Sequence, residues 1–457
     1  MVNIIEQDMV AGIEYLKGLG NFDKIGLLGH SMGAMTALKT SEDLTNQVNA
    51  TVIIGMSTGF EQDLHGILAG NNDTSSEYNL SKISNLLIAN GIFEQMFTKQ
   101  ISLDLLAEYT NLTGLQTETV YGNFTHGNAC KVVIGATEHL FEPHDYHIIY
   151  ESVEWFEKAF YGDIRWKITV TSIFYEISFY ITIIGILMLG FVLIIYIYRF
   201  FWQGKSQNLQ KNTIKDTSTL KLVIFYLISM IIGVLIMAVG IFTFGEILPV
   251  SLGELLFGIL AGTSIGSMIM YYIIIRKRAK LRDIPIRIKN MSSENYGRAI
   301  IYGVVSAALF ALLLTSIATW SIIITIPTLR ELGAILGMSI LFFPWFLMKE
   351  FYFRTVQGNL KTKNNPIKEY FIMFGIGFVM DSILIIPLMI LLWAKGALLG
   401  FMALALTVVV IFSLIQQCLV TWVYMYSGRN ILGSSIFLAL FYAWMVVNFY
   451  PFGLPLF

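Results

Sequence analysis

The sequence carries little charge. Of its 457 residues, 13% are Asp, Glu, Lys or Arg and 55% are hydrophobic, whereas soluble domains carry roughly 25% charged residues. Lys and Arg number 30, Asp and Glu number 31, and the net charge is -1. There is thus no positive excess to bind nucleic-acid phosphates. The composition excludes a purely soluble protein and argues against nucleic-acid binding.

Cysteine is almost absent. Cys130 and Cys418 are the only two, and Cys418 lies inside an apolar run, so we expect no disulfide. No Cys or Cys/His spacing predicts a metal site, and we expect no metal and no cofactor.

The first 20 residues also lack the basic start and apolar core of a signal peptide. They predict an amphipathic helix instead, from the spacing of Ile4, Ile5, Met9, Ile13 and Leu16.

Long apolar runs begin after residue 167. Each is long enough for a membrane-spanning helix, which needs about 17 to 25 residues. Eight are expected, at 173–198, 222–244, 252–275, 299–326, 332–348, 370–393, 397–426 and 431–452. We therefore predict an α/β domain over residues 1–165 and an all-α transmembrane bundle of about eight helices over residues 166–457, in contact with the lipid bilayer.

The loops between these runs predict the orientation of the chain. The loops after the first, third, fifth and seventh runs carry 19 Lys and Arg residues, whereas the alternate loops carry only Arg330 and Lys395. Cytoplasmic loops are enriched in Lys and Arg. We therefore expect a multi-pass protein of the cell membrane whose first domain lies on the extracytoplasmic side.

Glycosylation sequons agree with that orientation. N-x-[ST] occurs five times in the first domain, more often than its Asn, Ser and Thr content predicts by chance. Attached N-glycans are the functional interpretation, and an Asn- and Thr-rich surface without glycans is the alternative. The five sites are Asn49, Asn72, Asn79, Asn111 and Asn123.

Residues 24–41 contain the clearest catalytic motif. Their sequence, KIGLLGHSMGAMTALKTS, predicts a strand, a tight turn and a helix, with G-x-S-x-G at Gly29–Gly33. The turn would strain the backbone of Ser31 and require glycine at both flanking positions. The N–H of Met32, at the helix N-terminus, could then stabilise an oxyanion. An ordinary glycine turn is the alternative.

This motif resembles the α/β-hydrolase superfamily, most closely its dienelactone-hydrolase-like and acyl-peptidase-like members. Further strands are predicted at 50–56, 85–91 and 131–136, followed by a final helix at 150–160. The resemblance covers only the C-terminal half of such a fold, because the family places about a hundred residues before its nucleophile. We expect that the sequence is part of a longer protein, and a degenerate, inactive domain is the alternative.

The resemblance implies a catalytic triad in the chain order nucleophile, acid, histidine. Glu94 follows the 85–91 strand in a G-x-x-E pattern, where the family places its acid, usually Asp. His139 follows the last strand, where the family places its histidine. The resemblance therefore implies Ser31, Glu94 and His139. Glu94 could instead be a solvated acid at a helix start, and His144 and His147 lie close enough in sequence to replace His139, while His30 is expected to be structural.

The membrane region contains one acid in the middle of an apolar run. Asp381 lies within the sixth run, where an unpaired carboxylate is costly. Gln416, Gln417 and Asn448 are its possible partners from the last two runs. A transport or proton-coupled site is the functional interpretation, and hydrogen bonding between helices is the alternative.

A second polar segment follows the fifth run. Residues 349–354 resemble the E-E-x-x-x-R motif of CAAX-type intramembrane proteases, with Lys349 replacing the first Glu. That chemistry needs histidines on later helices, and all 6 histidines lie at or before residue 147. We therefore expect Glu350 and Arg354 to form an interfacial ion pair instead.

These patterns predict a membrane-anchored serine hydrolase that cleaves an ester, thioester or peptide bond through an acyl-enzyme. Its substrate, whether a small molecule, a lipid or a peptide, is left open. The alternative is a transporter or receptor-like membrane protein with a non-catalytic, hydrolase-like outer domain.

Overall fold

The computed structural model describes residues 2–449, except 21, 57–77, 95, 203–212, 215–216, 245–252, 278, 293–294, 317–325, 363–364, 384 and 394–396. The chain divides into two compact units, residues 1–178 with 387–407 and residues 179–386 with 408–457. Each is considered by itself.

The first unit is built on a parallel sheet of four strands in the order β1-β2-β3-β4. The strands are Gly26–His30, Ala50–Ile54, Leu86–Gly91 and Cys130–Gly135. Every residue of β2 and β3 is buried, as expected for apolar strands covered on both faces. The last three strands lie within two residues of the predicted positions, and β1 falls within the predicted strand–turn–helix segment 24–41. The carboxyl ends of all four meet at the same edge of the sheet.

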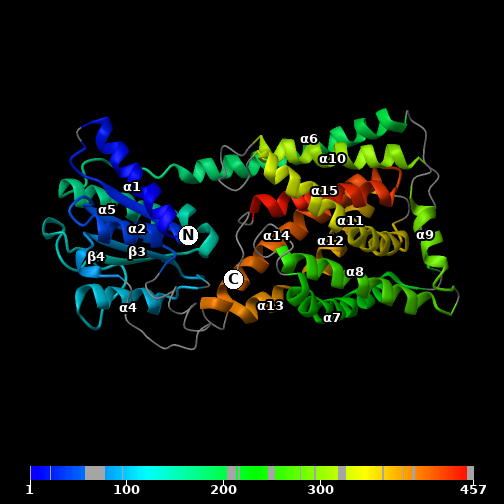
Figure 1. The fold of residues 1–457 in the computed structure, drawn as a ribbon, viewed down its shortest axis with the longest axis horizontal. Helices are drawn as coiled ribbons and strands as arrows, with labels where there is room; N and C mark the ends of the chain where they lie inside the picture. The colour runs from blue at the N-terminus through cyan, green and yellow to red at the C-terminus, as the bar shows by residue number, and fades with distance from the viewer. Residues whose placement is uncertain are drawn as a thin grey trace. The chain divides into compact units, whose positions relative to one another are not determined.

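Helices cover both faces of the sheet (Figure 1). One core cluster joins the sheet to α2 and α4, and a second joins its other face to α5, where Ile148 and Trp155 are buried. The predicted amphipathic helix forms α1 and packs Ile13 against α2 and β1. The bounds are Val2–Leu19 for α1, Met32–Asp43 for α2, Lys99–Thr110 for α4 and Tyr146–Tyr161 for α5. A short 3-10 helix, η3, spans His139–His144 between β4 and α5.

After residue 171 the described part of the chain is mostly helical. Among the described residues, six helices are long and apolar enough to span a membrane, and α12 with α13, bent by 41°, would make a seventh. A multi-pass membrane protein is supported, and the number eight stays a prediction. The helices are α6 Ser172–Trp202, α7 Thr219–Phe244, α8 Gly253–Ile275, α9 Asp283–Met291, α10 Tyr296–Thr315, α11 Leu329–Gly358, α12 Pro366–Ser382, α13 Ile385–Trp393, α14 Ala397–Met425 and α15 Ile431–Phe449.

The predicted end of the fifth run is wrong. Helix α11 continues ten residues beyond 348, so Lys349, Glu350 and Arg354 belong to a helix and are buried, where a position at the membrane interface was expected. The Glu350–Arg354 ion pair forms, with Nε 2.9 Å from Oε2, but at 1% exposure it is buried in the bundle. Two hydrogen bonds from Arg354 to Glu350 and one to Gln357 offset part of the cost of burying these charges.

Candidate active site

The turn between β1 and α2 holds Ser31 in an unusual conformation. Its φ of 55° and ψ of -121° lie outside the regions that L-residues prefer. The Ser31 N–H donates to the Ile54 carbonyl at 2.8 Å, which ties the turn to β2. A Cβ on Gly29 would lie 2.0 Å from the Gly33 carbonyl oxygen, whereas one on Gly33 would meet nothing within 4 Å. The expectation that both glycines prevent a clash is therefore wrong for Gly33.

Ser31, His139 and Glu94 form one hydrogen-bonded chain. The distances are 2.9 Å from Ser31 Oγ to His139 Nε2 and 2.7 Å from His139 Nδ1 to Glu94 Oε2. His139 is 2% exposed and Glu94 4%. The three residues follow β1, β4 and β3, so the shared edge of the sheet brings them together.

The partners of Glu94 fix its charge and the tautomer of His139. Burial alone would raise the pKa of Glu94, but the hydrogen bond and charge of His139 lower that pKa below its usual value. An ionised carboxylate can only accept, so His139 carries its proton on Nδ1. Nε2 is then free to accept the Ser31 proton. Because Glu94 also accepts from the backbone of Met96 at 2.8 Å, it is not a solvated surface acid.

The other predicted histidines lie elsewhere. His144 is exposed at the end of η3, and His147 lies 3.4 Å from Glu118 Oε2. Met32, the proposed oxyanion donor, begins α2 directly after the nucleophile. Its N–H belongs to the first turn, where a helix supplies no acceptor of its own.

Glu142 is a further residue of the site, not predicted from the sequence. This residue is fully buried, and its Oε1 accepts from the Gly91 N–H at 2.5 Å. Burial first, and then the charge of Glu94, raise the pKa of Glu142 to about 10. The available signal was spacing, because residues three apart in a 3-10 helix share a side and Glu142 is three residues after His139.

His30 lies on the other side of the triad histidine. Burial and the neighbouring His139 lower the pKa of His30 to about 4, so its imidazole is neutral at neutral pH. Its Nε2 donates to the His139 carbonyl oxygen at 2.9 Å. This contact supports the structural role expected from the sequence.

In the described part of the chain, two groups of side chains are close enough to hold a metal ion. One is His30, His139 and Glu142, part of the site above. The other is Glu118, His147 and Glu151, where the Lys131 ammonium lies 3.4 Å from Glu118 and 2.6 Å from Glu151. That ammonium occupies the place of a cation, so the second group is better explained as an ion-pair cluster.

The predicted glycan sites differ in exposure. Asn79, Asn111 and Asn123 are exposed, whereas Asn49 is half-buried and its Oδ1 accepts from the Ile25 N–H. Asn72 lies outside the described residues. Glycosylation itself stays a prediction.

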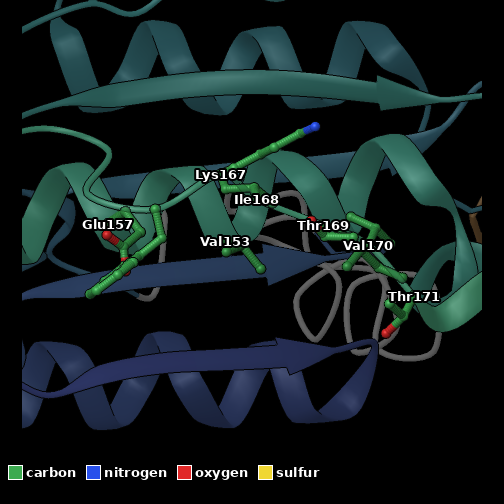
Figure 2. Close-up of a pocket in the computed structure, with 9 residues that line it drawn as sticks. Val153, Glu157, Lys167, Ile168, Thr169, Val170 and Thr171 are labelled. Atoms are coloured by element: carbon green, nitrogen blue, oxygen red, sulfur yellow. The ribbon is translucent and has the colours of Figure 1, made fainter.

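A separate groove of about 450 Å³ runs between α5 and the segment that follows it (Figure 2). Ile149, Val153 and Glu157 of α5 line it together with residues 166–171, and none of the triad residues takes part.

In the second unit, Asp381 is the centre of a buried polar cluster. Its carboxylate lies 2.9 Å from Lys349 Nζ, accepts from Tyr226 OH at 3.0 Å and accepts from Gln417 Nε2 at 2.7 Å. Lys349 was not predicted as a partner. Asn448, which was predicted, donates to the Trp444 carbonyl in its own helix and does not line the cavity beside the cluster.

That cavity, of about 40 Å³, is lined by Lys349, Asp381 and Gln416, among others. It can hold water but nothing much larger. Gln416 is 3% exposed, and its Nε2 has no hydrogen-bond partner among the described residues. Helix α12 ends one residue after Asp381, at the bend before α13.

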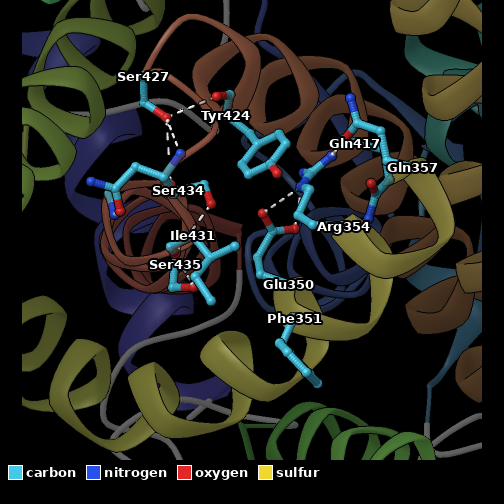
Figure 3. Close-up of polar contacts among 12 residues, drawn as sticks. Glu350, Phe351, Arg354, Gln357, Gln417, Tyr424, Ser427, Ile431, Ser434 and Ser435 are labelled. Atoms are coloured by element: carbon cyan, nitrogen blue, oxygen red, sulfur yellow. Dashed lines mark hydrogen bonds and ion pairs between the residues drawn. The ribbon is translucent and has the colours of Figure 1, made fainter. Parts of the chain in front are cut away.

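Arg354, the last residue of the 349–354 segment, belongs to a second buried ionic cluster. Figure 3 shows Arg354 directed at Glu350 and Gln357. Gln357 donates to Glu369, which also accepts two hydrogen bonds from Arg429. These charges balance, and the cluster links α11, α12 and the loop before α15.

No protein-family model, curated protein or solved structure matches this chain. The α/β-hydrolase resemblance therefore stays a prediction, and function is argued from the geometry of the site.

Proposed function

We propose that the first unit is a serine hydrolase that cleaves an ester, thioester or peptide bond through an acyl-enzyme. The hydrogen-bonded chain from Ser31 Oγ through His139 to Glu94, at 2.9 and 2.7 Å, carries the proposal. A glycine turn without catalytic function does not require a buried imidazole and an ionised carboxylate in line with its serine.

The geometry supports the following mechanism. Ser31 Oγ attacks the carbonyl carbon as its proton passes to His139 Nε2, and Glu94 stabilises the resulting imidazolium. The negative oxygen of the tetrahedral intermediate is placed for the Met32 N–H. His139 then protonates the leaving group as its bond to carbon breaks. In the second half, water gives a proton to His139 and attacks the acyl-enzyme, which releases the acid and returns the proton to Ser31.

Exposed apolar side chains beside the triad favour an apolar substrate. Met32, Phe93 and Phe141 each lie within two residues of a triad member and are 50%, 55% and 45% exposed. An apolar ligand that covers such side chains gains binding energy of about 25 cal/mol per Å². Among the open substrate classes, these side chains favour an ester or thioester with an apolar acyl group, such as a lipid.

Labelling with an alkyl fluorophosphonate tests the proposal. The full-length protein in detergent is expected to be labelled at Ser31, faster by a long-chain probe than by a short-chain one. Ser31→Ala should abolish labelling, whereas Ser84→Ala, at a half-buried serine before β3, should not change it. An unlabelled wild-type protein would contradict hydrolase function.

A second candidate function rests on the other unit. The buried carboxylate of Asp381 lies beside a cavity large enough for water, where the Gln416 amide has no hydrogen-bond partner among the described residues, and this arrangement supports proton-coupled transport by the membrane region. The first unit would then be a non-catalytic outer domain, and the fluorophosphonate result separates the two functions.

A further inference from the structure

Glu142 is a buried acid that the mechanism above does not use. Its Oε1 is bound by the Gly91 N–H, while its Oε2 lies 3.4 Å from His30 Nε2 and 3.6 Å from His139 Nδ1. No described residue gives Oε2 a hydrogen bond. An unbound, buried carboxylate oxygen next to a second carboxylate would be costly.

The protons around Oε2 are already in use. His139 has one on Nδ1, which points to Glu94, and the single proton of neutral His30 goes to the His139 carbonyl. Neither imidazole can therefore donate to Glu142. If Glu142 is itself protonated, its O–H becomes a donor. Glu94 is then the acceptor, because both carboxylates approach the same His139 Nδ1, Glu94 at 2.7 Å and Glu142 at 3.6 Å, and the two acids interact directly. Two adjacent acids in a buried site commonly share one proton in this way.

We propose that Glu142 is a positioning residue, a protonated acid that donates a hydrogen bond to Glu94 and so holds in place the carboxylate that orients His139. This role rests on the proposed hydrolase function. With one proton shared, the acid pair carries a single negative charge, which matches the single positive charge that His139 gains in the reaction.

The surrounding backbone leaves room for this acid. Gly55 follows β2 with a φ of 61°, and a Cβ at that position would lie 2.2 Å from Glu142 Oε2. Glycine is therefore required there for two reasons, its conformation and the space for the acid.

A metal ion held by His30, His139 and Glu142 is the rival explanation. Nδ1 of His139 has one lone-pair direction in the ring plane, and Glu94 occupies it at 2.7 Å. The protonated acid therefore fits the geometry better. If a metal ion occupied these three residues, a chelator would change the labelling of Ser31. If the site bound added zinc, zinc would slow labelling of wild type and not of a Glu142 variant.

The first test compares Glu142→Gln with Glu142→Leu in the full-length protein. The amide of Gln can accept from Gly91 and donate to Glu94 without ionising, so labelling of Ser31 should stay within about threefold of wild type. Leu can do neither, and we expect a loss of roughly 10-fold to 100-fold. Glu108→Gln, at an exposed acid of α4, is the control. The proposal would be overturned if Glu142→Gln and Glu142→Leu lost Ser31 labelling equally, or if Glu142→Leu lost none.

The second test does not depend on catalysis. Since the pKa of Glu142 is raised to about 10, the folded protein keeps this proton while the unfolded chain loses it above its ordinary pKa of 4.5. Relative to Glu142→Gln, wild type should therefore lose thermal stability as pH rises from 4.5 towards 10. If the thermal stabilities of wild type and Glu142→Gln change with pH in parallel, Glu142 is not protonated in the folded protein. Diverging curves in a protein that no probe labels would retain the protonated acid and reject hydrolase function.

Discussion

Gly29 and Gly33 flank the same serine but have different surroundings, and this difference can be tested. In Gly29→Ala the new Cβ would lie 2.0 Å from a backbone oxygen, so the turn must move. We expect a loss of about 1–3 kcal/mol in stability, together with most of the Ser31 labelling. Gly33→Ala adds a methyl group in open space at the start of α2 and should be tolerated or slightly stabilising. Thermal unfolding and Ser31 labelling of both variants measure these effects. Equal losses in the two variants would contradict the difference in the surroundings of the two glycines.

The residues of the candidate site differ in how well the sequence could predict them. Ser31, Glu94 and His139 each follow a strand, and the parallel sheet brings strand ends to one edge, so the chain order implied by the α/β-hydrolase resemblance was enough to name them. Glu142 reads as a surface acid before a proline. Its burial depends on Gly55 and Gly91, which lie 87 and 51 positions away in sequence, and such distant contacts leave no local pattern.

At the scale of elements, the Lys349–Asp381 ion pair joins α11 to α12, with α7 and α14 also bound to the carboxylate. Removing one partner leaves the other charged and buried. We expect Lys349→Met or Asp381→Leu alone to lower the free energy of unfolding by about 3–5 kcal/mol, and the double variant to recover most of that loss.

Unfolding of the detergent-solubilised protein measures these changes. Lys289→Met, at an exposed lysine of α9, is the matched control and should have little effect. If the double variant is as unstable as the sum of the single variants, then the two side chains do not act as a pair.

The sequence predicted the positions of most elements but not the end of α11, and the Lys349–Asp381 ion pair explains the difference. Strand positions follow from short apolar runs bounded by Gly and Asn, and the membrane helices follow from long apolar runs. The end of α11 did not follow, because Lys, Glu and Arg normally mark the end of an apolar helix. The partner of Lys349 is Asp381, which lies on another helix, and hydropathy along one run carries no information about pairing between runs.

At the scale of the whole molecule, the buried ion pairs also change the charge argument. Of the 19 Lys and Arg residues assigned to one set of loops, Lys349 and Arg354 are buried inside α11, and without these two 17 remain. Others also belong to helices but are exposed, namely Arg199, Lys221, Arg298 and Lys368. The opposite set has two at most. The orientation prediction therefore survives the correction, because the bias depends on loop residues and the contrast is still large.

Accessibility of introduced cysteines tests this orientation in intact cells. Asn111, exposed at the end of α4, and Lys289, exposed on α9, report on opposite sides of the membrane if the charge bias is right. An impermeant maleimide should then modify Asn111→Cys without cell lysis and Lys289→Cys only after lysis. The parent chain sets the background, because Cys130 is buried and Cys418 is partly buried. The reverse pattern would place Ser31 in the cytoplasm, where N-glycans could not form and the substrate would have to be a cytoplasmic ester or thioester.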